Sequence, residues 1–227
     1  MKKRILLFIV SVTIIFTSIP VAKAAPLGVY HNHENMGNKI ALTFDDGPHP
    51  RYTREILAVL AEYQVRATFF FVGENVLYYE DTARAVAQAG HEIGNHTYTH
   101  ARPDRLSRDD LDRELAQCEE IIQRVTDTSP KLFRPPQGNW NSEVYSLARE
   151  RDYDIILWNI DTLDWAHTPM QEICRHVLER VCSGDIILMH DYHSKGCATT
   201  QALKELIPQL LDRGFHFVTV SELIGSV

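Results

Sequence analysis

The chain has 227 residues and is acidic, with 30 Asp and Glu against 23 Lys and Arg and a formal charge of −7. An acidic surface repels phosphate backbones, so this composition excludes nucleic acids and other polyanions as tight electrostatic partners. The four cysteines have no Cys-x-x-Cys spacing, which excludes a zinc ribbon or a dithiol redox motif. A neutral substrate fits this charge better.

The first 24 residues have the pattern of a secretory signal peptide. A basic start is followed by an apolar run over residues 5–19 and by small residues around Ala24, where we expect cleavage. The run is short for a membrane span of about 20 residues, and an uncleaved anchor is the alternative. Cleavage removes four basic residues and no acidic ones, leaving 203 residues with a formal charge of −11. We expect a secreted or cell-wall-associated monomer with no membrane span.

Strands and helices alternate along the rest of the chain. Residues 25–38 are predicted to be a short lead-in and residues 39–227 one catalytic domain. Short apolar runs predict strands, and segments with apolar residues three and four apart predict helices. The predicted strands are 38–42, 67–72, 91–95, 131–133, 153–160, 185–189 and 215–220. The predicted helices are 53–64, 81–89, 107–125, 141–151, 169–181 and 200–213. This order predicts a single α/β barrel of about seven parallel strands.

Polar residues follow the strands at the ends that meet on one face of such a barrel. They come from five separate strands, and active sites of parallel barrels are built at that face. These residues are Asp45, Asp46, His96, Arg134, Asp161, Asp164 and His190. Their arrival at one face by chance is improbable, and we expect them to form the active site.

Asp45 and Asp46 directly precede Gly47-Pro48. Taken by itself, an Asp-Asp-Gly segment is common in solvent-exposed turns, and such a turn is the alternative to a functional site. Four residues separate His96 from His100, so on one helical face they can share a metal ion. With Asp46 as a third ligand, the set resembles a catalytic zinc site with an open position for water. Asp45 should point away from the ligand, because successive residues of an extended chain face opposite sides. It is then the expected general base beside metal-bound water.

His190 approaches from the opposite side of the barrel and is the expected general acid. Asp164 is placed to hold the His190 ring charged and oriented, as carboxylates do for catalytic imidazoles. Arg134 is placed to orient Asp45, with a surface arginine before a Pro-Pro turn as the alternative.

Five ordered segments resemble the motifs of the polysaccharide deacetylases, the NodB-homology or carbohydrate esterase family 4. The segments are Thr43-Phe44-Asp45-Asp46-Gly47, His96-Thr97-Tyr98-Thr99-His100, Arg134-Pro135-Pro136-Gln137-Gly138, Asp161-Thr162-Leu163-Asp164-Trp165 and Leu188-Met189-His190. The resemblance spans about residues 39–223. It implies a distorted barrel and hydrolysis of N-acetyl groups on N-acetylglucosamine-containing glycans, in peptidoglycan or chitin oligomers.

The resemblance also implies roles for individual residues. Asp45 would be the base, held by Arg134, and Asp164 would tune the acid His190. One divalent ion, zinc or else cobalt, nickel or manganese, would be held by Asp46, His96 and His100. Trp165 and Leu188 would line the acetyl pocket. The third motif usually has Tyr where this chain has Gln137, whose backbone N–H would still bind the oxyanion.

Two alternatives to an N-deacetylase are compatible with the same motifs. An O-acetyl esterase of the xylan type uses the same machinery, and a catalytically silent glycan-binding domain keeps the fold. A zinc peptidase is disfavoured because His-Glu-x-x-His is missing, and a dinucleotide binder because Gly-x-Gly-x-x-Gly is missing.

The cysteine pairing stays open. Cys174 and Cys182 are predicted to share one helix about 12 Å apart, too far to bond to each other. Cys182 and Cys197 both border loops and can pair, and free buried thiols are the alternative, with the state of Cys118 equally open.

Overall fold

The computed structural model describes residues 27–34, 37–192 and 198–226. Within these ranges the strands are β1 (Val29–Tyr30), β2 (Lys39–Asp45), β3 (Thr68–Phe71), β4 (Glu92–Asn95), β5 (Leu132–Phe133), β6 (Asp154–Ile156), β7 (Ile160–Asp161), β8 (Ile186–His190) and β9 (His216–Phe217). The α-helices are α1 (Tyr52–Glu62), α2 (Gly73–Tyr78), α3 (Glu80–Gln88), α4 (Arg108–Thr126), α5 (Ser142–Glu150), α6 (Met170–Arg180), α7 (Thr199–Asp212) and α8 (Val220–Ile224).

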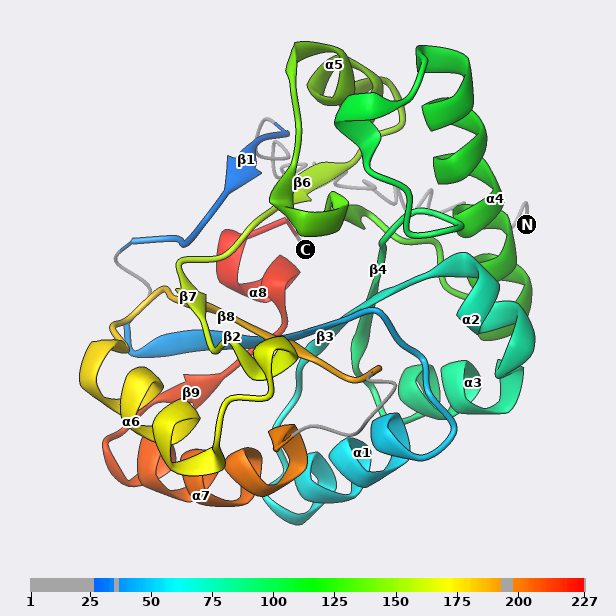
Figure 1. Cartoon of the computed structure of the whole chain (residues 1–227). Coiled ribbons are helices and arrows are strands. Elements are labelled where there is room, and N and C mark those ends of the chain that lie inside the picture. Colours follow the sequence, from blue (N-terminus) through cyan, green and yellow to red (C-terminus); the bar gives the residue numbers. More distant parts are fainter. Residues whose placement is uncertain (1–26, 35–36, 193–197, 227) are drawn as a thin grey trace, which may run out of the picture.

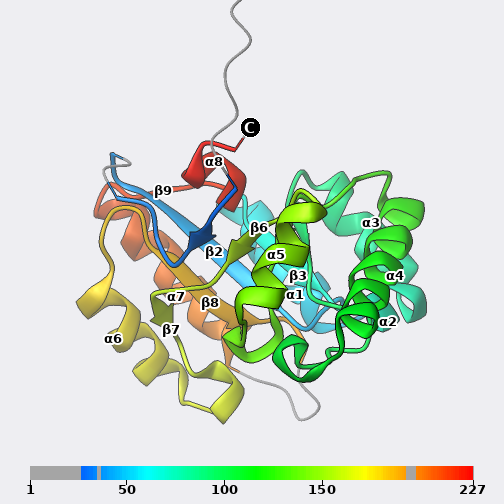
Figure 2. The same ribbon diagram turned by 90° about the horizontal axis from the view of Figure 1, so that it is seen from above.

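The strands form one curled parallel sheet (Figure 1). Their order is β1-β6-β5-β4-β3-β2-β8-β7, and β9 pairs with β2 beside this path. Figure 2 shows α6 and α7 on one side of the strands and α2, α3 and α4 on the other. The predicted parallel α/β barrel is confirmed. It is open, because β1 and β7 are the two ends of the sheet order.

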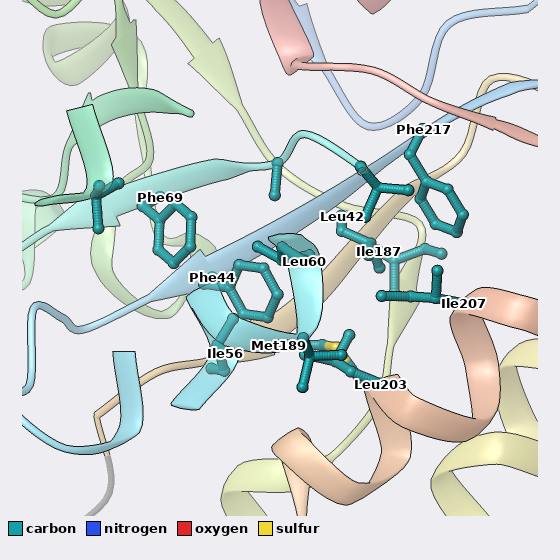
Figure 3. Close-up of a cluster of buried hydrophobic side chains, with 14 of the residues drawn as sticks. Leu42, Phe44, Ile56, Leu60, Phe69, Ile187, Met189, Leu203, Ile207 and Phe217 are labelled. Carbon is teal, nitrogen blue, oxygen red and sulfur yellow. The ribbon is translucent and has the colours of Figure 1, made fainter. Parts of the chain in front are cut away.

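The alternation of side chains along β2 and β8 divides the core into an outer and an inner layer. Leu42, Phe44 and Met189 point outward and pack with Ile56, Leu60 and Leu203 of helices α1 and α7 (Figure 3). Ala41 and Ile186 belong to an inner cluster with Val220, Leu223 and Ile224 of α8. Because the side-chain period of a strand is two, Asp45 and His190 continue the inner face.

The predicted strand 153–160 is wrong as a single element. The structure divides it into β6 and β7, which lie near opposite ends of the sheet order. β6 pairs with β1 and β5, whereas β7 pairs with β8. The apolar run Tyr153 to Ile160 looks continuous because both halves are buried, although they pack in different places.

Other differences concern short elements. The lead-in 25–38 contributes β1, and helices α2 and α8 were not predicted. The predicted strand 215–220 shrinks to β9, because Thr219 caps α8 through a reciprocal pair of hydrogen bonds with Glu222. The remaining predicted elements are present, with ends shifted by a few residues.

Two predictions involve residues outside the described ranges, namely the signal peptide over residues 1–24 and the pairing of Cys182 with Cys197. Cys118 and Cys174 are buried free thiols. Cys182 lies two residues beyond the end of α6 and does not share that helix. No helix in the described part of the chain is both long and apolar enough to cross a membrane.

Candidate active site

Asp45 and His190 end two neighbouring strands. They are register partners in the β2–β8 pairing, and both continue the inner face of the sheet. The pairing therefore places a carboxylate and an imidazole side by side at the carboxyl ends of the central strands. This is the face at which the sequence predicts the active site.

Arg134 holds Asp45 from inside the barrel. Its Nη1 donates to Asp45 Oδ1 at 2.7 Å and to Thr43 Oγ1 at 2.8 Å. The guanidinium also donates to the carbonyl oxygens of Ile156 and Leu157, at 3.1 and 3.0 Å. Burial lowers the pKa of Arg134, while the charge of Asp45 and their hydrogen bond act in the opposite direction. Arg134 is fully buried and so not the surface arginine of the alternative interpretation.

Asp46, His96 and His100 converge on one point. Asp46 Oδ1 lies 3.1 Å from His100 Nε2 and 3.4 Å from His96 Nε2. Within the described residues, these three side chains form the one group of His, Cys, Asp or Glu with metal-ligand spacing, their ligand atoms all within 4.8 Å of one another.

Two local predictions for this cluster differ from the structure. The segment from His96 to His100 is not helical, because Thr97 and His100 have positive φ angles of 64° and 60°. Glu114 of α4 holds this loop by accepting from the amides of Tyr98 and Thr99. Asp46 is not extended either, with φ of 75°. Its left-handed backbone, and not simple alternation, therefore sets its direction relative to Asp45.

The hydrogen bonding of His96 shows that the cluster fits a cation. His96 Nδ1 lies 2.7 Å from the carbonyl oxygen of Arg134, which can only accept, so Nδ1 carries the hydrogen. If the ring is neutral, Nε2 has no hydrogen and faces the Asp46 carboxylate at 3.4 Å. Two hydrogen-bond acceptors then point at each other, which is unfavourable. A bound cation removes this conflict. Two imidazole nitrogens and one carboxylate oxygen suit zinc and other first-row divalent metals.

The short distances within this cluster also shift the pKa values of Asp46 and His100. Burial raises the pKa of Asp46, but the hydrogen bond to His100 and the close approach of His96 outweigh burial and hold it well below its usual range. The hydrogen bond to Asp46 raises the pKa of His100 against the effect of its own burial.

His190 is paired with a different carboxylate. Its Nδ1 lies 2.7 Å from Asp164 Oδ1, and its backbone N–H donates to Asp164 Oδ2 at 2.9 Å. Thr199 Oγ1 also donates to Asp164 Oδ2, at 2.6 Å. Burial lowers the pKa of His190, but the hydrogen bond and charge of Asp164, with the charges of Asp45 and Asp46, raise it to about 9. The ring is therefore protonated at neutral pH.

A cavity of about 400 Å³ opens over these groups. It is lined by Asp45, Asp46, His96, His100, Gln137, Trp158, Asp161, Trp165, Leu188 and His190. Arg134 and Asp164 lie behind it, in contact with the residues they orient. Trp165 is 50% exposed, and its Nε1 donates to Asp161 Oδ1 at 3.3 Å. All ten predicted site residues are thus at the cavity or directly behind it, and their chemical roles stay predictions.

Gln137 stands at the cavity in a left-handed conformation, with φ of 60°, and its side chain is exposed. Leu188 is inward-facing on β8, with Thr162 Oγ1 donating to its carbonyl oxygen at 2.8 Å. These positions are compatible with the predicted contacts to substrate.

Sequence reasoning missed several residues at this site. Trp158 lines the cavity, whereas the sequence predicts it inside one continuous strand. Its place two residues before β7, which leads into the site, is the signal that could have identified it. The Thr43 hydroxyl accepts a hydrogen bond from Arg134. The Thr199 hydroxyl donates one to Asp164. No pattern around Thr199 predicts its contact with a residue 35 positions earlier.

Comparison with known proteins points to one family. A family model described as polysaccharide deacetylase matches residues 32–156. A peptidoglycan-N-acetylglucosamine deacetylase of Bacillus cereus is 39% identical over 187 residues, 82% of this chain and 87% of that protein. The crystal structure of Bc1960, a peptidoglycan N-acetylglucosamine deacetylase, matches with a TM-score of 0.84 and 32% identity, covering 88% of this chain and 94% of that one.

Two further solved structures are similar but carry different descriptions. A family 4 acetyl xylan esterase from Clostridium thermocellum, in complex with cobalt, has a TM-score of 0.76 and 34% identity, covering 82% of this chain and 90% of that one. BA3943, a CE4 family pseudoenzyme from Bacillus anthracis, has a TM-score of 0.82 and 28% identity, covering 89% of this chain and 70% of that one.

Proposed function

Because the chain belongs to the polysaccharide deacetylase family, we propose that it is a metal-dependent hydrolase that removes N-acetyl groups from N-acetylglucosamine-containing glycans. Peptidoglycan and chitin oligomers are the proposed substrates, and the bond cleaved is the carbon–nitrogen bond of the acetamide. The Bacillus cereus relative and the structural neighbour Bc1960, both named as peptidoglycan deacetylases, support this choice.

One observation carries the proposal. A single cavity brings together a carboxylate held by arginine, a protonated histidine held by aspartate, and a three-residue cluster that fits a cation. Amide hydrolysis needs a base, an acid and stabilisation of the developing oxyanion, and the three arrangements supply one each.

The residues of the chain divide the proton transfers between them. Asp45 Oδ1 is bound by Arg134, while Oδ2 lies 3.7 Å from His96 Nε2 on the side of the cluster. We assign to Asp45 the removal of a proton from the attacking water. Protonated His190 donates to the departing nitrogen, and Asp164 stabilises its charge and orientation. Acetate and a free amine on the sugar are the products.

Asp46, His96 and His100 are the proposed ligands of one divalent cation, zinc first and cobalt, nickel or manganese as alternatives. When bound, such a cation lowers the pKa of a water molecule and polarises a carbonyl group. We assign a second stabilising contact for the oxyanion to the backbone N–H of Gln137, and the walls of the acetyl pocket to Trp165 and Leu188. The left-handed turn at Gln137 and the cavity lining support this assignment.

We further propose export through residues 1–24 and a catalytic domain over residues 39–227. Its site would then act outside the cell or in the cell wall, where peptidoglycan is found. The basic and apolar pattern of the first 24 residues supports export.

The test is acetate release with parallel detection of new primary amines. The purified protein is given N-acetylglucosamine oligomers, peptidoglycan and acetylated xylan, with and without a chelator. We expect acetate and amine in equal amounts, both lost with chelator. Acetate without amine would instead show the O-esterase that the acetyl xylan esterase neighbour illustrates. No acetate from any substrate would favour a silent domain such as the pseudoenzyme neighbour.

Asp45→Asn is the matched control for this assay. It keeps the size of the side chain and an oxygen facing Arg134 but removes the base. Turnover should fall by about 10² to 10⁴-fold, while the metal content measured by elemental analysis stays at the wild-type level. Wild-type turnover in this variant would remove Asp45 as the base.

A further inference from the structure

Asp191 is a buried carboxylate to which the proposed reaction gives no role. It follows His190, is 1% exposed and does not line the cavity. Thr53 Oγ1 of α1 donates to its Oδ2 at 2.6 Å. Its Oδ1 has no hydrogen-bond partner within the described residues. Burial and the nearby charges of Asp46 and Asp45 raise the pKa of Asp191 to about 7. An apolar side chain of similar size would avoid this cost, so the carboxylate needs another explanation.

The carboxylate of Asp191 lies directly against Gly47. A Cβ atom added at Gly47 would overlap both carboxylate oxygens of Asp191. The φ angle of Gly47 is not in the left-handed region, so the backbone alone does not require glycine there. Residue 47 must be small because the Asp191 carboxylate fills the space that a side chain would take.

Hydrogen bonds from the residue after β8, from the N-cap of α2 and from α2 itself hold the same turn. The N–H of Asp191 donates to the carbonyl oxygen of Asp45 at 3.1 Å, and the N–H of Val72 to that of Gly47 at 2.9 Å. Asn75 Nδ2 of α2 donates to the carbonyl oxygen of Asp46 at 2.7 Å. Asp191 therefore contacts the turn at both ends, through its amide at Asp45 and through its carboxylate at Gly47.

We propose that Asp191 is a positioning residue, which together with Gly47 sets the direction in which Asp45 and Asp46 enter the cavity. The inference rests on the proposed function, since it concerns the assigned base and one assigned metal ligand. It also connects the two halves of the site, because the residue after the assigned acid fixes the turn that carries the assigned base. A displacement of about 1 Å at reacting groups can cost about 10²-fold in rate.

A double-mutant cycle tests this pairing. Gly47→Ala should push the turn away from Asp191 and weaken zinc binding about tenfold, with kcat falling by about 10²-fold and KM nearly unchanged. Asp191→Ala should also weaken both, through loss of the anchor. In Gly47→Ala/Asp191→Ala the new methyl group enters the vacated space, so the double variant should be no worse than Asp191→Ala alone. Zinc affinity is measured on the chelator-treated protein by competition with a chromophoric chelator.

Two further variants separate positioning from general stability. Asp191→Asn keeps the shape of the side chain and an oxygen for the Thr53 hydroxyl, and should retain most of the zinc affinity. Asp185, buried at the other end of β8, accepts from Asn159 Nδ2 and the Cys182 amide. Asp185→Asn should lower the thermal midpoint without changing zinc affinity.

Additive losses in the double variant, or wild-type zinc affinity and kcat in Gly47→Ala, would overturn the inference while leaving the proposed function intact. Failure of the wild-type protein to bind zinc or release acetate would instead overturn the proposed function, and the inference with it.

Discussion

The active site contains two arrangements of histidine and aspartate that have opposite chemistry. In one, His190 faces Asp164 through Nδ1, and its pKa rises to about 9. In the other, His96 gives its Nδ1 hydrogen to the Arg134 carbonyl and turns its Nε2 toward Asp46. A proton supplies the positive charge in the first arrangement, whereas the second fits a metal cation. The partner of Nδ1 decides which role an imidazole can take.

His100→Ala should separate the two arrangements most strongly. It removes one of three ligand atoms, so bound metal should be lost and activity should fall by about 10³-fold, the order seen when a main electrostatic contribution is removed. Elemental analysis of the purified variant checks the metal content. His190→Ala is the control and should keep its metal while losing activity. Unchanged metal in His100→Ala would contradict the ligand assignment.

The protonated arrangement should also contribute to stability in a pH-dependent way. The pKa of His190 is about 9 in the folded protein against an ordinary value of 6.5. Its stabilisation is therefore complete below pH 6.5 and is lost as the pH rises through about 9. The free energy of unfolding should decrease by up to about 3 kcal/mol across this range. Urea unfolding of the chelator-treated protein at several pH values measures it.

His190→Gln cannot titrate and provides the reference for that experiment. The difference in unfolding free energy between wild type and variant should shrink as the pH rises from 6.5 to 9. A difference that stays constant over this range would show that the His190 ring is not protonated in the folded protein.

Asp164→Asn should weaken the acid without touching the metal site. Without the carboxylate the pKa of His190 falls, so the alkaline limb of the pH–rate profile should move to lower pH. At neutral pH, kcat should decrease by about 10²-fold. Metal content at the wild-type level, together with the shifted limb, would distinguish this variant from His100→Ala. A profile in its wild-type position would contradict the pairing.

Thr199→Val should give the smallest effect. It removes one hydrogen bond to Asp164, of about 1.5–3 kcal/mol, and keeps the shape of the side chain. Asp164 retains both of its contacts to His190, so only part of this loss reaches the acid and kcat should decrease by less than about tenfold. The alkaline limb should move in the same direction as in Asp164→Asn, by a smaller amount. A larger loss than in Asp164→Asn would mean that Thr199 does more than hold that carboxylate.

Sequence patterns predicted the parallel sheet, most helices and the face on which the site lies. They could do so because apolar periodicity and strand ends are local properties. They did not predict that residues 153–160 divide into β6 and β7, since both halves are buried and only their strand partners differ. Local patterns also could not place Trp158 at the cavity. They predicted the directions of Asp45 and Asp46 from the alternation of an extended chain, whereas Asp46 has a left-handed backbone.

The sequence by itself determined which side chains are available for chemistry, namely the Asp45–Asp46 pair, the two spaced histidines and His190. The tertiary structure alone decided how they are connected. The carbonyl of Arg134 selects the His96 nitrogen that faces the cation site, Asp164 charges His190, and Asp191 fills the space beside Gly47. These contacts join residues from 26 to 144 positions apart, as in Asp164–His190 and Gly47–Asp191. Such contacts exist only after the strands have paired, because no local pattern brings distant parts of a chain within hydrogen-bond distance.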